Sequence, residues 1–387
     1  MHPAGSLHLI QILFVDDDKS VLDGLRRSMH SMRSAWNMSF ATGGAEALAL
    51  LAAAPADVVV TDMRMPGMTG RDLLAEVKRL YPQSVRFILS GYAESSSIMQ
   101  VAGTAHQYLS KPCDVATLKT SVSRAFALRR LLRDERLVRR IGQVDTLPSL
   151  PSTYQRILAC LREPEPDIAE AGRIIGADMV MTAMILKLAN SAFFGVGKSF
   201  KTAERAVSFL GLDTIGGLVL GHSLFKEFAA AEIGGINLEQ LWQHSLLTAA
   251  GARKLALHEG WGTAQAEEVF LAGVLHDLGK LVLATRPDTG ADNSTDASGN
   301  DHAEAGAYLL GLWGFSDPLI EAIAFHHTPS QAAGQGFGLA GMLHVADRMA
   351  HMRSATDEIA FESGYLESVG VASHVEGWLS VISKAAA

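Results

Sequence analysis

Short apolar runs alternate with amphipathic stretches over the first third of the chain. Four runs, mostly β-branched or aromatic, end in polar residues and lie at Ile12–Val15, Val58–Val60, Val85–Leu89 and Gln107–Ser110. Such runs are typical of strands covered on both faces. Helical patterns lie between them, as at Ala45–Ala54 and Arg71–Leu80. The alternation predicts an α/β domain with a doubly wound parallel sheet.

A helical pattern without a break runs from Leu118 to about Ile141. Seven arginines lie between Arg124 and Arg140, so a solvated connecting helix is one interpretation. The other is a signalling helix that pairs two protomers, which leaves a homodimer open. Pro148 and Pro151 then mark a boundary, because proline rarely continues a helix.

The second half of the chain carries helical periodicity and no convincing series of strands. The periodic segments are Met179–Leu188, Ala203–Leu210, Leu238–Leu257, Ala266–Leu275 and Ala303–Leu312. A polar stretch rich in Asp, Ser, Thr and Gly follows Pro287 and predicts a loop or disorder. This half is therefore expected to form an all-α helical domain.

Composition narrows the classes of protein that this chain can belong to. The 387 residues are 48% hydrophobic and carry a net charge of -8, so the chain can bury large cores and nucleic acid is not the expected partner. Two cysteines are too few for a disulfide framework. No apolar run is long enough to span a membrane, and the N-terminus does not read as a signal peptide. We therefore expect a cytoplasmic protein without membrane insertion.

Polar side chains collect where the predicted strands end. Asp16 and Asp17 follow the first run, Asp62 the second, Ser90 the third and Lys111 the fourth. The carboxyl ends of strands in a doubly wound sheet meet at one crevice, so these side chains should lie together. Clustered carboxylates need a cation, and Mg²⁺ prefers oxygen ligands. The set suits phosphoryl transfer to a carboxylate, in which a lysine stabilises the charge.

The same residues resemble the receiver domain of two-component response regulators. The matching motifs are Phe14-Val15-Asp16-Asp17, the stretch from Thr61 to Gly70, Ser90-Gly91 and the stretch from Tyr108 to Pro112. The resemblance implies a five-stranded parallel sheet and a sensor histidine kinase as partner.

The receiver resemblance also implies a role for each residue of the set. Asp62 would accept the phosphoryl group, and Lys111 would contact it. Asp17 and Asp62 would ligate Mg²⁺ directly, with Asp16 acting through water and Arg64 through its backbone carbonyl. Ser90 and Tyr108 would form the switch pair, in which the hydroxyl moves to the phosphoryl group and the ring follows it inward.

A second set of polar residues lies on the later helices. It consists of His244, His276, Asp277, His302, His326, His327 and Asp347. Imidazoles and carboxylates gathered from several helices build metal sites in helical domains. Two divalent metals bridged by an aspartate would activate water for attack on a phosphate ester. The set therefore predicts a divalent transition-metal site for Fe, Mn, Ni or Zn.

This second set resembles the HD superfamily of metal-dependent phosphohydrolases. Its order and spacing are also similar to those of the HD-GYP phosphodiesterases of cyclic di-GMP. Two departures count against that narrower family: Thr328-Pro329-Ser330 follows His327 without a Gly-Tyr-Pro motif, and position 240 is Gln where a trinuclear site would want Glu.

The segment before the second set resembles the HDOD domain, an HD-related output module. The matching stretches are Leu147-Pro148-Ser149-Leu150-Pro151, Leu186–Gly195 and Ala206–Gly211. The resemblance implies a receiver at residues 8–128, a helical linker at 129–143, an HDOD domain at 144–352 and a C-terminal helical tail at 353–387. Many HDOD domains lack metal ligands and act through protein contacts, whereas this chain retains the set.

Several polar residues near the second set are open to simpler interpretations. His344 and His351 flank Asp347 and are expected to be ordinary helix residues. Lys280 would either contact a phosphate or be a solvated lysine after a glycine.

Two functions follow from the two resemblances. The first is a phosphorelay response regulator in which phosphorylated Asp62 switches the HDOD domain, which signals to an unknown downstream protein. The alternative is a phosphorylation-controlled phosphohydrolase, acting on a cyclic dinucleotide or nucleotide. The first is favoured, because binding a metal does not by itself make a reaction.

Overall fold

The computed structural model describes most of the chain. It covers residues 9–90, 104–111, 115–129, 135–142, 148–149, 156–157, 159–161, 163, 165–190, 199–212, 215, 226–227, 232–233, 235–284, 301–334, 336–352 and 361–383. The chain folds into two compact units. The first comprises residues 1–146 with 190–198 and 312–314, and the second comprises 147–189, 199–311 and 315–387. Each unit is described by itself.

The first unit is built on a five-stranded sheet of order β2-β1-β3-β4-β5 in which all pairs are parallel. The strands are β1 (Ile10–Val15), β2 (Trp36–Ala41), β3 (Val58–Asp62), β4 (Val85–Ser90) and β5 (Gln107–Ser110). The predicted doubly wound fold is confirmed. Edge strand β2 has no apolar run, because its burial alternates along WNMSFA.

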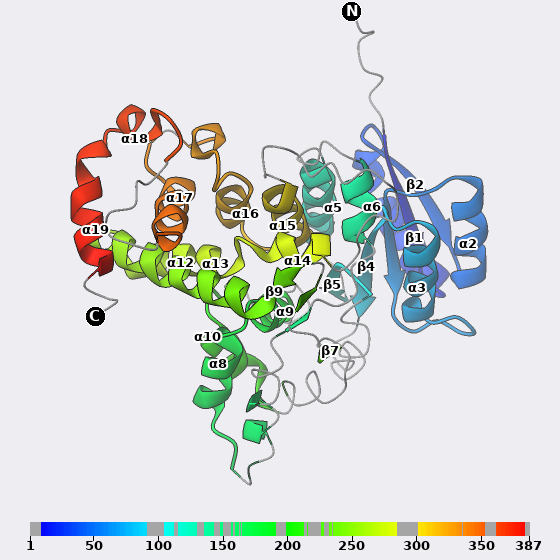
Figure 1. The fold of residues 1–387 in the computed structure, drawn as a ribbon. Coiled ribbons are helices and arrows are strands. Elements are labelled where there is room, and N and C mark those ends of the chain that lie inside the picture. The colour runs from blue at the N-terminus through cyan, green and yellow to red at the C-terminus, as the bar shows by residue number, and fades with distance from the viewer. Residues whose placement is uncertain are drawn as a thin grey trace, which may run out of the picture. The chain divides into compact units, whose positions relative to one another are not determined.

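Helices α1 (Lys19–Ser28), α2 (Gly44–Ala53) and α3 (Gly70–Leu80) connect the strands. Two of them begin at side chains that cap the helix. Asp18 Oδ1 accepts a hydrogen bond from Ser20 N at the start of α1, and Thr69 and Asp72 form a capping box at the start of α3. Figure 1 shows α2 and α3 side by side along the blue strands.

Two helices follow the sheet, α5 (Val115–Arg129) and α6 (Glu135–Gly142). Both lie in the segment for which an unbroken helix is predicted. Residues 130–134 lie outside the described part of the chain, and so do 91–103 and 112–114.

The second unit is mostly helical, as predicted. Its longer helices are α8 (Ile168–Gly176), α9 (Met179–Ala189), α10 (Ala203–Leu210), α12 (Leu238–His258), α13 (Thr263–Leu275), α14 (Leu278–Ala284), α15 (Asp301–Leu312), α16 (Asp317–Ala324), α17 (Leu339–Ala350) and α19 (Val375–Ser383). The described strands here are only two residues long: β6 (Pro148–Ser149), β7 (Lys226–Glu227), β8 (Glu232–Ile233) and β9 (Ile236–Asn237). The loop predicted after Pro287 lies outside the described residues.

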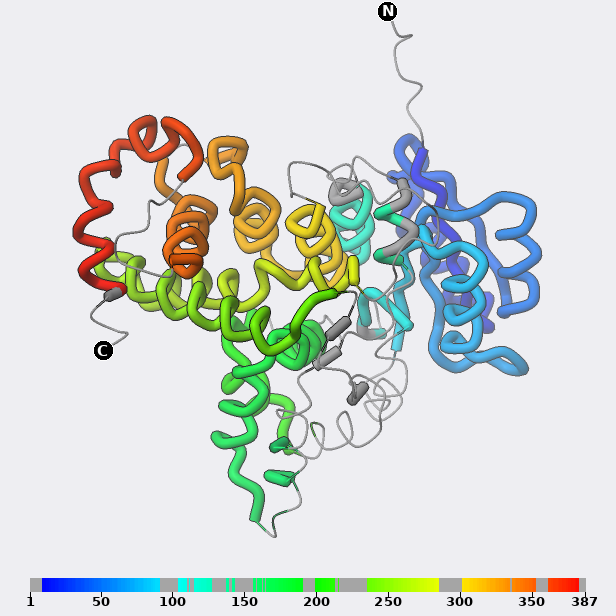
Figure 2. The backbone as a smooth tube through the Cα atoms, viewed as in Figure 1, coloured from blue at the N-terminus to red at the C-terminus, as the bar shows by residue number. Residues whose placement is uncertain are grey.

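Helices α12, α13 and α17 surround the best-defined core of this unit. Leu255, Val269 and Val345 are fully buried there, and Trp378 from α19 closes one end of the cluster. The tube in Figure 2 shows α12 and α13 running along each other. This packing fixes the helices that carry His244, the His276-Asp277 pair and Asp347. Over the described residues, every helix is too short or too polar to cross a lipid bilayer.

Candidate functional site

The carboxyl ends of β1, β3, β4 and β5 bring the first predicted set together. Lys111 Nζ lies 2.7 Å from Asp16 Oδ2 and 2.5 Å from Asp62 Oδ1. Asp16 and Asp62 are buried, at 2% and 8% exposure, although they are far apart in the sequence. One ammonium group therefore bridges two buried carboxylates at the edge of the sheet.

Backbone groups hold the two carboxylates in place. Asp62 Oδ2 accepts a hydrogen bond of 3.0 Å from Arg64 N, and Asp16 Oδ1 accepts one of 3.0 Å from Asp18 N. Lys111 N donates to Ser90 O at 2.8 Å, which continues the pairing of β4 with β5. The site is therefore positioned by the strand ends themselves, with Asp17 exposed beside it.

Burial and charge oppose each other at this cluster. Burial raises the pKa of Asp62, and the hydrogen bond and charge of Lys111 offset only part of the effect. Burial by itself would lower the pKa of Lys111, but its bonds to Asp16 and Asp62 outweigh burial and raise that pKa. The pair of carboxylates thus lacks a full charge complement, which is the condition under which a bound cation is favourable.

The predicted switch residues lie on β4 and β5, which follow β3 in the sheet. Ser90 is the last residue of β4 and is fully buried. Tyr108 in β5 is also fully buried, and burial raises the pKa of its phenol. The ring is thus turned into the protein rather than toward solvent.

The second predicted set also converges, from five helices or helix ends. His244 lies on α12, the His276-Asp277 pair joins α13 to α14, His302 lies on α15, the His326-His327 pair follows α16, and Asp347 lies on α17. Asp277, His276, His326 and Asp347 are at most 1% exposed. All seven predicted residues are therefore neighbours in the folded domain.

Asp277 has imidazoles on both sides of its carboxylate. Its Oδ1 lies 3.3 Å from His302 Nε2, and its Oδ2 lies 3.4 Å from His276 Nε2. His302 Nε2 is in turn 3.2 Å from His327 Nε2. His276, Asp277 and His326 form one group with metal-ligand spacing, and His302, His326 and His327 form another.

Asp347 gathers a third group of possible ligands. Its Oδ1 lies 2.9 Å from His244 Nε2 and 3.5 Å from His276 Nε2. His244, His276 and Asp347 again have the spacing of metal ligands. His276 and His326 each belong to two of the three groups, so the groups share ligands and adjoin one another.

The buried imidazoles are oriented as metal-binding histidines are. His276 Nδ1 lies 2.8 Å from Gly273 O, and His326 Nδ1 lies 2.7 Å from Ile323 O. Each Nδ1–H can donate to its carbonyl, which leaves Nε2 as a lone-pair donor. Within the described residues, His326 Nε2 and Asp347 Oδ2 have no hydrogen-bond partner despite their burial. Buried polar atoms without partners are expected at a metal site.

Opposite charges in the cluster shift the pKa values of Asp277 and His276. Burial raises the pKa of Asp277, but His276, His302 and Lys280 outweigh it and hold that pKa well below its usual range. Burial lowers the pKa of His276, and the carboxylates of Asp277 and Asp347 more than reverse this.

The pKa values of the neighbouring histidines, His326 and His327, are lowered instead. Burial, followed by the effects of His276 and His327, lowers the pKa of His326 well below its ordinary value. Burial and His302 lower the pKa of His327 to about 4. His326 and His327 are therefore neutral near pH 7, and a neutral imidazole is the form that ligates metals.

A close approach of two helices brings Asp277 to His302. Gly279 at the start of α14 packs against α15 so tightly that a Cβ would lie 1.8 Å from His302 O. Only glycine fits there. Lys280, the next residue, places its Nζ 2.6 Å from Asp277 Oδ2 while its side chain stays 34% exposed. The lysine therefore takes part in the cluster and still reaches solvent.

The two histidines that flank Asp347 differ in their surroundings. His344 bonds through Nδ1 to His326 O and through Nε2 to Glu362 N, so both nitrogens bind backbone groups, as suits a packing residue. His351 instead lies at the edge of the cluster, where its ring centroid is 4.2 Å from that of His244. Its Nδ1 lies 2.9 Å from Asp347 O on the same helix and 3.4 Å from Asp347 Oδ1. That His351 is an ordinary helix residue stays a prediction, and its i, i+4 spacing accounts for both contacts.

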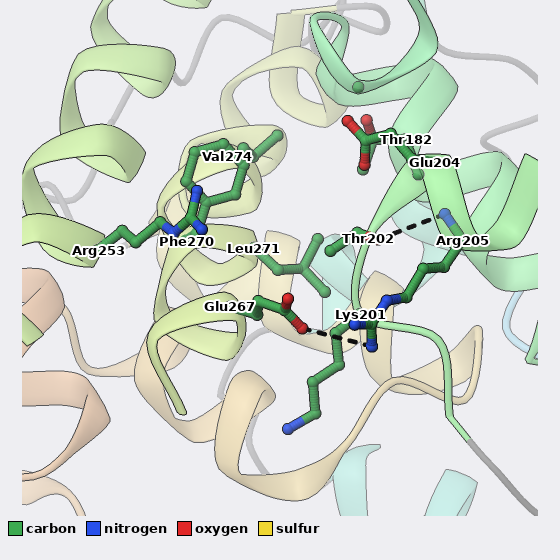
Figure 3. Close-up of a pocket in the computed structure, with 12 residues that line it drawn as sticks. Thr182, Lys201, Thr202, Glu204, Arg205, Arg253, Glu267, Phe270, Leu271 and Val274 are labelled. Carbon is green, nitrogen blue, oxygen red and sulfur yellow. Dashed lines mark hydrogen bonds and ion pairs between the residues drawn. The ribbon is translucent and has the colours of Figure 1, made fainter. Parts of the chain in front are cut away.

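A separate cavity of about 360 Å³ lies between α10 and α13 (Figure 3). Lys201 and Arg205 line one side, with Glu267 and Phe270 on the other. Arg205 Nη1 lies 3.7 Å from Glu267 Oε2, and Lys201 Nζ lies 2.9 Å from Glu268 Oε2. The Arg205–Glu267 ion pair therefore joins α10 to α13.

Two known families match the two halves of the chain. Residues 12–123 match the response regulator receiver domain, and residues 147–329 match the HDOD domain. The chain is a response regulator with an HDOD output domain. The finer domain boundaries given above remain predictions.

Individual relatives of this response regulator match only parts of it. An uncharacterized protein of Treponema pallidum is 27% identical over 200 residues, which is 48% of this chain and 38% of that protein. The hydrogenase transcriptional regulatory protein HoxA of Cupriavidus necator is 39% identical over 103 residues, 26% of this chain and 21% of HoxA. The response regulator thus spans well under half the length of these curated relatives.

Solved structures include the MmoQ response regulator of Methylococcus capsulatus. It is 21% identical, and the match covers 62% of this chain and 94% of MmoQ with a TM-score of 0.47.

Proposed function

We propose that this response regulator receives its signal as a phosphoryl group on Asp62, donated by a sensor histidine kinase. The observation that carries the proposal is the contact of one ammonium, Lys111, with the buried carboxylates of Asp16 and Asp62. In-line transfer to a carboxylate needs a nucleophilic oxygen beside fixed positive charge, and the strand ends supply both.

Mg²⁺ fits the same site, because the donor set is all oxygen and the two buried carboxylates are under-neutralised. Asp17 and Asp62 would hold the ion directly, Asp16 through water, and the carbonyl of Arg64 would join them. When bound, the metal supplies positive charge for the transferring phosphoryl oxygens. The chain's own groups orient the reaction: Arg64 N fixes one oxygen of Asp62, which leaves Oδ1 beside Lys111.

The switch would be read by Ser90 and Tyr108, which lie on the strands next to the phosphoryl site. Ser90 Oγ would bond the phosphoryl group, and the buried Tyr108 ring would hold that arrangement. The HDOD domain would then change its contacts with a downstream protein. A homodimer paired through the linker helix is compatible with this scheme.

Phosphorylation can be tested on the purified protein. Incubation with Mg²⁺ and a small phosphodonor should add one phosphoryl mass, which peptide mapping should place on Asp62. Asp62→Asn should remove the added mass. Asp57→Asn, at the residue just before β3, should not. An unchanged mass gain in Asp62→Asn would refute the assignment.

A second candidate function is metal-dependent phosphate-ester hydrolysis by the HDOD domain. The observation favouring it is the buried cluster of five imidazoles and two carboxylates, in which His326 Nε2 and Asp347 Oδ2 have no hydrogen-bond partner. Nitrogen with oxygen donors suits Fe, Mn, Ni or Zn. His244, His276, Asp277 and Asp347 would hold one ion, and Asp277 with His302, His326 and His327 a second. Bound metal supplies a water nucleophile near neutral pH.

Metal analysis separates the two candidates. The protein should bind a divalent transition metal, and His276→Ala with Asp277→Ala should remove it. Hydrolysis of a cyclic dinucleotide or nucleotide by the wild type, lost in the double variant, would establish the enzyme. Full downstream signalling by the metal-free double variant would instead leave protein contact as the output.

A further inference from the structure

Arg86 is a buried charged residue near the start of a core strand of the receiver. It lies in β4 and is 1% exposed. Its Nε donates to Thr104 O at 2.9 Å, Nη1 to Ser84 O at 3.1 Å, and Nη2 to Gly142 O at 2.9 Å. A buried guanidinium is tolerated only when its donors are satisfied, and here backbone carbonyls satisfy them.

One of these carbonyls belongs to the helix that follows the receiver. Gly142 is the last residue of α6 and lies 56 residues from Arg86 in the sequence. The last carbonyls of a helix have no partner within the helix and carry partial negative charge, so a guanidinium is a fitting cap. Val138 and Ile141 on the same helix are 5% and 0% exposed. The end of α6 is therefore docked into the receiver by both packing and charge.

The docking leaves no room for a side chain at position 142. A Cβ there would lie 1.8 Å from Pro82 O, at the segment between α3 and β4. Such a distance is far below van der Waals contact, so any other residue would push α6 away from Pro82. Gly142 is thus matched to Pro82 on one side and to Arg86 on the other.

Arg86 also joins the two strands that carry the switch residues. Arg86 N lies 3.0 Å from His106 Nδ1, and His106 N donates to Arg86 O at 2.8 Å. His106 directly precedes β5, which contains Tyr108, while Arg86 is the second residue and Ser90 the last residue of β4. Ser90 therefore lies at the carboxyl end of β4, whereas Arg86, which binds α6, lies near its amino end.

We propose that Arg86 fastens α6 to β4 and β5, so that the linker helix moves with these strands as a lever when Asp62 is phosphorylated. The lever rests on the proposed function of Asp62. Arg86 acts here as a positioning residue, because it does not touch the phosphoryl site. Without the contact between Arg86 and Gly142, a movement of the strands would not be passed along α6 to the HDOD domain, which begins at residue 147.

Hydrogen exchange of the full-length protein tests the fastening without phosphorylation. Gly142→Ala should make the amides of residues 135–142 exchange at least ten-fold faster, because the new methyl group clashes with Pro82. Arg86→Met should do the same by removing the cap. Gly24→Ala in α1 is the matched control, because its Cβ meets nothing within 4 Å and alanine there should only slow local exchange.

The direction of the change in exchange decides this test. Alanine favours helix more than glycine, so without the clash at Pro82 the Gly142→Ala substitution should slow exchange in α6. Unchanged or slower exchange at residues 135–142 in this variant would overturn the fastening. If Arg86→Met fails to fold, Gly142→Ala still decides, since it leaves the core of the sheet intact.

Phosphorylation then tests the lever. In the wild type, the phosphodonor should change exchange within residues 147–329, and Gly142→Ala should abolish that change while gaining the same phosphoryl mass. If the variant responds as the wild type does, the lever is overturned and the proposed function stands. If the phosphorylated wild type shows no change in residues 147–329, the proposed output fails and the lever with it, whereas faster exchange in the unphosphorylated variants still supports the fastening.

Discussion

The Nε2 atoms of His302 and His327 lie 3.2 Å apart. Two imidazole nitrogens at this distance share either a proton or a cation, because two lone pairs facing each other repel. His302 Nε2 is also 3.3 Å from Asp277 Oδ1, so these three atoms would be ligands of the second proposed ion. The relationship between these two rings leads to the first prediction.

His327→Ala should lower the bound transition metal by about one equivalent and leave the ion held by His244 and Asp347 in place. Loss of one ligand should weaken binding about 10–100-fold or more, since loss of outer partners alone has effects of that size. Elemental analysis after dialysis measures the stoichiometry. His344→Ala is the control, because it removes a buried imidazole that bonds backbone groups: it should lower stability and keep the metal. Equal metal loss in both variants would show that the effect is a general loosening of the fold.

Lys111→Met should destabilise the receiver most when divalent cations are absent. The substitution leaves the buried carboxylates of Asp16 and Asp62 facing each other without the ammonium, and we expect a loss of about 1–2 kcal/mol in the free energy of unfolding, reduced from fully buried pairs because the lysine is partly exposed. Mg²⁺ should restore part of this loss by replacing the missing charge. Chemical denaturation in Mg²⁺ and in EDTA measures the difference. A loss that is identical in the two buffers would argue against a cation site at these carboxylates.

Gly279→Val should separate α14 from α15 and disrupt the second cluster, although Gly279 is not itself one of the seven cluster residues. The new side chain would meet His302 O, so Asp277 and His302 would no longer approach each other. We expect a destabilisation of about 2–3 kcal/mol, typical of overpacking, together with loss of bound metal. Thermal unfolding and elemental analysis measure the two effects. Gly334→Val, at a glycine whose Cβ would have open space, is the comparison and should keep its metal.

His351→Ala should weaken metal binding without abolishing it. His351 packs against His244 and contacts Asp347 at the exposed edge of the cluster, so we expect it to help to position these residues. Removing such a supporting partner should reduce affinity about ten-fold, with little change in stability because the side chain is 56% exposed. Competition with a coloured chelator measures the affinity. His258→Ala, at an exposed histidine that ends α12, should behave as the wild type; an unaltered affinity in His351→Ala would assign His351 to the surface alone.

The sequence by itself determined the receiver almost completely. The apolar runs before Asp16, Asp62, Ser90 and Lys111 are local signals, and the topology of a doubly wound sheet brings their ends together regardless of detail. Strand β2 was not predicted, because this edge strand alternates in burial and shows no continuous apolar run. The seven residues of the HDOD cluster were also found from type and spacing, and the structure brings all of them together.

Only the tertiary structure decided which nearby residues join these sites. His344 and His351 look alike in the sequence, but His344 bonds to His326 O and Glu362 N, whereas His351 bonds to Asp347 of its own helix and packs beside His244. Contacts such as those of His344 and of His351 with His244 depend on how segments distant in the sequence pack in the fold. The partners of Arg86 could not be predicted from the sequence for the same reason. It sits within an apolar run, and the carbonyl that it caps belongs to a helix 56 residues away. The sequence carries the chemistry of each side chain, while long-range packing selects its partner.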